Sequence, residues 1–169
     1  NSIAVSINVG GVTATPTCTA LAWSTTLDAT SVSDSASVTI TANHSDVSGN
    51  TATQASTTVL KDTALPTVAI TSSPVINNAN KAAYVVSGTC SENTRTVSIN
   101  VGGVTATPTC TTLAWSATLN VTAVGDGTSV AITADHTDAA ANSATQASSS
   151  VVKDTLIPTV AITSSPDIN

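Results

Sequence analysis

The sequence repeats itself after 92 residues, and this repeat limits the possible folds more than any other feature. The run LPTVAITSSP at 65–74 returns as IPTVAITSSP at 157–166, and VSINVGGVTATPTC at 5–18 returns unchanged at 97–110. The shift needs no gap, and about two-thirds of the overlapping positions are identical. A unit of this length has the size of a small domain rather than of a solenoid repeat. The chain is therefore expected to be a tandem array of small domains.

Pro66 and Pro158 mark the starts of successive units. We expect a domain at 1–62 that lacks its first strands, a complete domain at 63–154, and the first strand of a further domain at 155–169. The chain is interpreted as a window from a longer array, because 169 residues are a little under two periods.

The composition argues against several classes of function. Only 8% of the residues are charged and four are Lys or Arg, so neither nucleic acid nor an anionic membrane surface is an expected partner. No apolar run approaches the ~18 residues of a membrane span, so no membrane insertion by this segment is expected. Each repeat has one histidine, and no catalytic set has a convincing spacing, so we do not expect an enzyme.

The complete unit is predicted to consist of β-strands, because β-branched residues are abundant and no stretch has a helical period. Gly102-Gly103 separates two alternating runs, which predicts a two-residue hairpin. Seven short strands separated by turns indicate an all-β, immunoglobulin-like β-sandwich. The expected strands are 66–72, 82–90, 94–101, 104–110, 113–119, 130–136 and 143–154.

The alternation also predicts which side chains face the core. Leu113 and Trp115 share one face of their strand with Ala117 and Leu119, so Trp115 is expected to fill the core, as is its counterpart Trp23. On a later strand the inward positions are Val130, Ile132 and Ala134. Pro108 predicts an edge strand, because proline cannot donate a ladder hydrogen bond.

The cysteines follow the repeat. Cys18 and Cys110 are equivalent, and shifting Cys90 back by 92 places its counterpart just before residue 1. Each full repeat thus carries two cysteines twenty residues apart, which predicts a Cys90–Cys110 disulfide with Cys18 left without its partner. A disulfide indicates an oxidising, extracellular setting. The alternative is a pair of reduced, buried thiols.

Three segments resemble a known family. KDTALPTVAI, LAWSTTLD and HSDVSGNTAT resemble motifs of the tandem bacterial Ig-like domains of large surface adhesins and biofilm-associated proteins. In that family a D-T-x-x-P-T linker, a T-W-S-x-T-L strand and a D-x-A-G-N turn recur. The second copy departs from the pattern at DAAAN (138–142), and the cysteine pair is not general in the family. The resemblance implies a secreted protein of the bacterial cell surface.

The expected strand directions bring several acidic loops to one end of the unit. Asp62 of the linker, Glu92, and Asp138 with Asn142 should gather there, and Asp154 would begin the next junction. Carboxylates and amides are the ligands of Ca²⁺, and the resemblance points to calcium at or near linkers. These residues are therefore a candidate calcium site.

The same loop residues have simpler interpretations. Asp62 can be a turn residue, and Asp138 with Asn142 can form an Asx-type turn. His136, at the inward end of its strand, is interpreted as a hydrogen-bonded capping residue like its counterpart His44, rather than as a metal ligand.

The function expected from the sequence is a structural spacer or stalk repeat of a secreted bacterial adhesin or biofilm-matrix protein. Its partners would be neighbouring Ig-like repeats, with any glycan or cell-surface receptor bound elsewhere in the parent protein. One alternative is a glycan- or protein-binding module, since the repeats differ most at 28–36 and 43–51 and at their counterparts. Another is a filament subunit that donates the spare strand at 157–163 to a neighbour.

Overall fold

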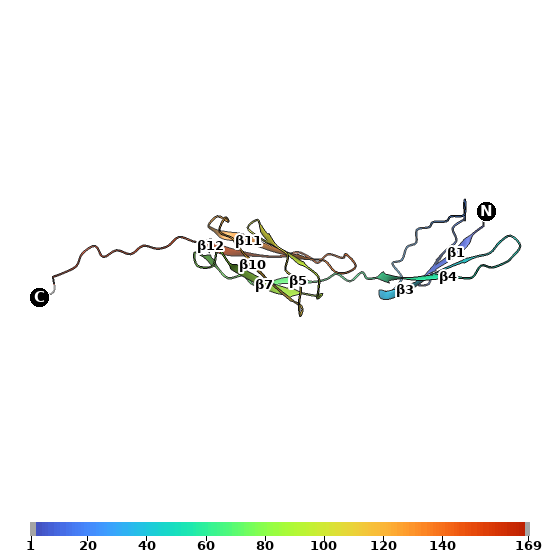
Figure 1. Ribbon diagram of the computed structural model, residues 1–169, viewed down its shortest axis with the longest axis horizontal. Helices are drawn as coiled ribbons and strands as arrows, with labels where there is room; N and C mark the ends of the chain where they lie inside the picture. The colour runs from blue at the N-terminus through green and yellow to red at the C-terminus, as the bar shows by residue number, and fades with distance from the viewer. Residues whose placement is uncertain (1–2, 168–169) are drawn as a thin grey trace. The chain divides into compact units, whose positions relative to one another are not determined.

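The computed structural model describes residues 3–167, and every regular element among them is a β-strand. The chain divides into two compact units, Asn1–Ala64 and Leu65–Asn169 (Figure 1). Within the described residues, no helix has the length and apolar character needed to cross a membrane.

The second unit is a sandwich of two sheets, which confirms the predicted immunoglobulin-like fold. One sheet has the strand order β10-β7-β5, and the other has the order β6-β12-β11-β8-β9. The only parallel pair among the described strands joins the short β6 to β12. The strands are β5 (Val68–Ser72), β6 (Ile76–Asn77), β7 (Tyr84–Cys90), β8 (Val97–Val101), β9 (Val104–Ala106), β10 (Ala114–Leu119), β11 (Gly127–His136) and β12 (Ala147–Asp154).

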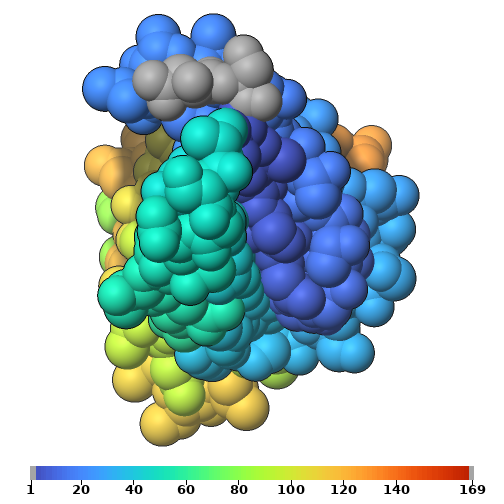
Figure 2. Space-filling view, turned by 90° about the vertical axis from the view of Figure 1, so that its right-hand side faces the viewer, coloured from blue at the N-terminus to red at the C-terminus, as the bar shows by residue number. Residues whose placement is uncertain are grey.

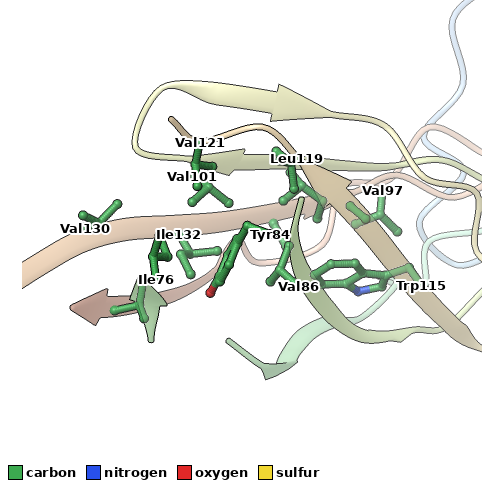
Figure 3. Packing of buried hydrophobic residues seen from close by; sticks show 14 of the residues in the cluster. Ile76, Tyr84, Val86, Val97, Val101, Trp115, Leu119, Val121, Val130 and Ile132 are labelled. Atoms are coloured by element: carbon green, nitrogen blue, oxygen red, sulfur yellow. The ribbon is translucent and has the colours of Figure 1, made fainter. Parts of the chain in front are cut away.

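The core of this unit lies between the two sheets, where alternate side chains of each strand meet (Figure 3). Tyr84 and Val86 of β7 pack against Ile132 of β11 and Val101 of β8, and all four are fully buried. The Tyr84 hydroxyl donates to the Pro74 carbonyl over 2.9 Å, so the polar end of this fully buried side chain is satisfied.

The predicted glycine hairpin is confirmed between β8 and β9. Gly102 and Gly103 have φ angles of +55° and +95°, which is the conformation that a type I′ turn requires at both central residues. β9 lies at the edge of its sheet, as Pro108 predicted.

Three strand predictions were wrong in detail. Leu113 is 52% exposed rather than buried, because it lies in a tight turn with φ of +60° that points it away from the core. The predicted loop after β5 contains β6, which is too short to show a period. β12 starts at Ala147 rather than at residue 143, because residues 143–146 belong to the turn after β11.

The first unit contains one four-stranded sheet with the order β2-β1-β3-β4. After the shift of 92 these strands match β9, β8, β11 and β12. They are β1 (Val5–Val9), β2 (Val12–Ala14), β3 (Ser35–His44) and β4 (Ala55–Lys61). In Figure 2, where this unit faces the viewer, the β1 region (dark blue) and the β4 region (teal) both lie at the surface.

The two tryptophans differ in burial. Trp115 is 3% exposed, as predicted, but Trp23 is 44% exposed, so its predicted core position was wrong. The residues that would match β5 and β7 fall before residue 1 after the shift, and among residues 3–64 no other strand replaces them.

Candidate functional site

Two of the predicted acidic residues meet at one end of the second unit. Glu92 follows β7 and Asp138 follows β11, and one carboxylate oxygen of each lies within 4.8 Å of the other. Glu92 Oε2 also accepts a hydrogen bond from the Ala139 amide over 3.1 Å. The structure thus brings together the loops that the strand directions predicted.

Asp138 is buried and closes a turn with Asn142. Its Oδ1 accepts from the Asn142 amide over 2.8 Å, and its Oδ2 accepts from the Asn142 side-chain Nδ2 over 2.9 Å. Burial raises the pKa of Asp138, but the hydrogen bonds from Asn142 outweigh it and hold the pKa below its usual value. The carboxylate is therefore charged at neutral pH, as a cation ligand must be.

A cation of the protein itself already contacts this turn. Arg95 Nη2 donates to the main-chain carbonyl of Asp138 over 2.6 Å. The Asp138–Asn142 pair thus forms the Asx-type turn that was the simpler interpretation, and it does so with both carboxylate oxygens engaged. Asp46 and Asn50 form the same turn in the first unit, at 2.8 and 2.7 Å.

Asp62 and Asp154 occupy equivalent places at the starts of linkers. Asp62 Oδ1 accepts from the Ala64 amide, and Asp154 Oδ1 accepts from the Leu156 amide, both over 3.0 Å. Asp154 ends β12 opposite Asn77, at the other end of the second unit from Glu92. Asp154 therefore lies apart from Glu92 and Asp138, where the outgoing linker begins.

His136 is 2% exposed and ends β11 on its inward side. Its Nδ1 lies 3.1 Å from the Thr96 carbonyl, which can only accept, so Nδ1 carries the proton. Within residues 3–167, Nε2 is buried without a hydrogen-bond partner. The ring is hydrogen-bonded at the end of the strand, as expected for a capping residue.

The sequence analysis did not predict one further feature, a set of polar contacts that holds the outgoing linker. Asp126, just before β11, accepts from Lys153 Nζ over 2.8 Å and from the Thr155 amide over 3.1 Å. The Lys153 hydrogen bond, followed by that of Thr155, lowers the pKa of Asp126. Lys153 itself is only 3% exposed.

The same contacts recur in the first unit. Asp34 accepts from Lys61 Nζ and from the Thr63 amide, each over 3.0 Å. The sequence carried a signal for it, since the loop SVSDSAS becomes AVGDGTS while its aspartate is retained. We call the Asp126–Lys153–Thr155 contact the linker clamp.

No family model and no characterised protein sequence matches this chain. Solved structures that match include a Ca²⁺-stabilized, ice-binding adhesin of an Antarctic bacterium (23% identity, TM-score 0.48). Another is a tandem-repeat segment from the extending region of a large adhesion protein (24% identity, TM-score 0.47). They cover 92% and 88% of this chain, which spans 41% of each of them.

Fibronectin(III)-like modules of Clostridium thermocellum CbhA also match, with 16% identity and a TM-score of 0.51. This match covers 90% of the chain and 79% of the modules. It supports the β-sandwich fold, because fibronectin type III domains share that architecture.

Proposed function

We propose that this chain is a load-bearing spacer of a secreted, adhesive surface protein, with neighbouring repeats as its partners. The observation that carries the proposal is the path of the chain through the second unit. Val68 at the start of β5 pairs with Cys90 at one end, whereas β12 finishes beside Ile76 and Asn77 at the other end (Figure 1). Each repeat therefore adds its own length, about 33 Å for a ten-residue strand such as β11.

The contacts at the two ends suit a part that transmits force. Where the chain enters the unit, the Thr67 amide donates to Ser91 Oγ over 2.9 Å, and the Ser91 amide donates to the Thr67 carbonyl over 3.0 Å. Where the chain leaves, the linker clamp ties Thr155 to Asp126. Tension on either linker is thus passed to the sheets through hydrogen bonds rather than to a loose loop.

An extracellular, bacterial setting is part of the proposal. Disulfides persist in oxidising compartments, and the structure joins Cys90 to Cys110. The motifs that resemble bacterial adhesins point to the cell surface.

The load-bearing role is tested by pulling single molecules of this chain from its two ends. We expect Asp126→Asn to lower the unfolding force of the second unit, because the buried Lys153 loses its charged partner. Asp135→Asn is the matched control, since Asp135 is exposed near the other end of β11 and contacts Gln146 rather than the linker. Equal forces for the wild type and both variants would contradict a clamp that carries load.

We further propose that Ca²⁺ binds beside Glu92 and Asp138, with Asp62 of the preceding linker as a third carboxylate. Hard cations such as Ca²⁺ prefer several oxygen ligands. Two of these carboxylates lie within 4.8 Å in the second unit. The contacts of Thr67 with Ser91 fix the incoming chain next to Glu92, and Asp62 comes only five residues before Thr67.

Calcium binding is tested by titration calorimetry on the whole chain. We expect Asp138→Asn to weaken binding at least tenfold, since it removes one ligand charge, whereas Asp135→Asn should leave it unchanged. The Asn side chain keeps an acceptor for the Asn142 amide, so the turn should survive. Identical titrations for both variants, or no heat with the wild type, would rule out this site.

A further inference from the structure

The Cys90–Cys110 disulfide lies at the end of the second unit where the chain enters. Cys90 ends β7 and pairs with Val68, the first residue of β5. The Cys110 amide donates to the Arg95 carbonyl over 2.7 Å, and the Cys110 carbonyl accepts from the Thr94 amide over 2.8 Å. These contacts hold Cys110 against the loop before β8, in the other sheet. The bond therefore links the two sheets of the sandwich.

Both cysteines are buried in the folded unit. Cys90 is 3% exposed and Cys110 is 1% exposed, and both belong to the same hydrophobic cluster as Trp115. Thiol–disulfide exchange requires a thiolate to reach one of the two sulfur atoms. The folded sheets therefore shield this bond from dissolved thiols, and the bond becomes accessible only when the sheets separate.

The disulfide also determines which part of the unit carries tension after unfolding. A force applied to the two linkers passes along the chain to Cys90, across the sulfur–sulfur bond, and on from Cys110. Residues 91–109, which contain β8 and β9, lie outside this path while the bond is intact. Because the two cysteines are 20 residues apart, releasing this segment would lengthen the unfolded unit by about 60 Å.

We propose that Cys90–Cys110 is a site of covalent modification by small thiols that tension opens. In the folded unit burial closes the bond to reagents, and in the unfolded unit the intact bond limits extension. A thiol that cuts the bond then gives the unit further length without breaking its main chain. The proposal rests on the load-bearing role proposed above, and it adds a response to overload and to the thiol content of the surroundings.

The reaction is a thiol–disulfide exchange with a small aliphatic thiol such as glutathione. Its thiolate attacks the sulfur of one cysteine and forms a mixed disulfide there, while the other cysteine leaves as a thiolate. One disulfide is consumed and one is formed, so no oxidant is needed. When tension ceases, the free cysteine thiolate attacks the mixed disulfide, expels glutathione and restores the original bond.

Protection by burial is tested on the full chain carrying Cys18→Ser, so that only the disulfide can react. The chain is incubated with millimolar glutathione, either folded or unfolded in urea, and mass spectrometry follows the mixed disulfide. We expect the folded chain to react at least a hundredfold more slowly than the unfolded chain. Equal rates would show that the bond is open in the folded unit and would overturn the proposal.

Opening by tension is tested by pulling single molecules of the same chain from their two ends at constant force, with and without glutathione. Without the thiol, we expect the second unit to unfold in one step. With glutathione, we expect a further step of about 60 Å that always follows this unfolding and comes sooner at higher thiol concentration. The matched control combines Cys90→Ser with Cys110→Ser, and its single unfolding step should be longer by the same amount in both solutions.

The outcomes separate this inference from the load-bearing role. Normal resistance to unfolding without a thiol-dependent second step would overturn the inference and leave the load-bearing role in place. A thiol-dependent step that comes before unfolding would also overturn it, because the folded sheets would then not shield the bond. A second unit that unfolds without measurable resistance would contradict the load-bearing role, and with it the response to overload.

Discussion

At the scale of single residues, Gly88 determines how closely the tryptophan packs on its own sheet. A methyl group at this position would lie 1.8 Å from the Ala69 carbonyl oxygen and 2.6 Å from Cζ2 of Trp115. The close approach lets the indole Nε1 reach the Thr89 carbonyl. Gly88 therefore has a packing role that no larger residue can take.

We expect Gly88→Ala to destabilise the second unit by about 3 kcal/mol or more, because the core cannot absorb the added methyl without moving backbone. Gly127→Ala is the matched control: a methyl there meets nothing within 4 Å, so its effect should stay within about 0.5 kcal/mol. Denaturant unfolding followed by tryptophan fluorescence measures both. If the Gly88→Ala protein were as stable as the control, that result would contradict the close packing described around Trp115.

Residue periodicity predicted burial well where strands are regular and failed at their ends. Trp115, Ile132 and Ala134 are buried as the alternation indicated. Leu113 keeps the right spacing but lies in a turn with positive φ, and periodicity cannot detect that change of backbone conformation. The Asp126–Lys153 pair was missed because its members are 27 residues apart and only the fold brings them together.

At the scale of elements, the Cys90–Cys110 disulfide joins the end of β7 to the segment that follows β9. It closes a loop with a sequence separation of 20 residues. A loop of this length is expected to contribute about 3 kcal/mol by restricting the unfolded chain. Because the aliphatic core of this unit is small, the cross-link is expected to supply a large share of its stability.

Replacing both Cys90 and Cys110 by serine should therefore lower the free energy of unfolding of the second unit by about 3 kcal/mol. Cys18→Ser is the control, because Cys18 is a free thiol and is only half buried. Calorimetry under non-reducing conditions compares the three proteins. A stability loss for Cys18→Ser as large as that for the double variant would contradict the assignment of the stabilising pair.

Most elements of the second unit could be predicted because their apolar residues alternate regularly and the repeat gave a second copy of most strand patterns, though not of β7. The state of residues 22–27 could not, since almost the same sequence forms β10 in the second unit. Strand formation there depends on a long-range partner, which local sequence does not encode. The acidic loops were placed correctly because strand directions alone decide at which end of a sandwich they lie.

At the scale of the whole molecule, the second unit is a domain whose incoming and outgoing chains lie at opposite ends. Such a domain lengthens a protein by a fixed amount each time it is repeated, provided that the junctions are stiff. Calcium at Glu92, Asp138 and Asp62 is the proposed source of that stiffness. Length and its dependence on calcium are therefore the properties that decide between a spacer and a compact binding module.

Small-angle X-ray scattering on proteins with one, two and three complete repeats, in millimolar Ca²⁺ and again in a chelator, measures both properties. We expect the maximum dimension in Ca²⁺ to grow by an equal step of about 30–40 Å for each repeat. In the chelator the steps should shrink as the junctions bend. Equal steps in both solutions would support the spacer but contradict the calcium site. Proteins that stay compact or flexible in Ca²⁺ would contradict the spacer itself.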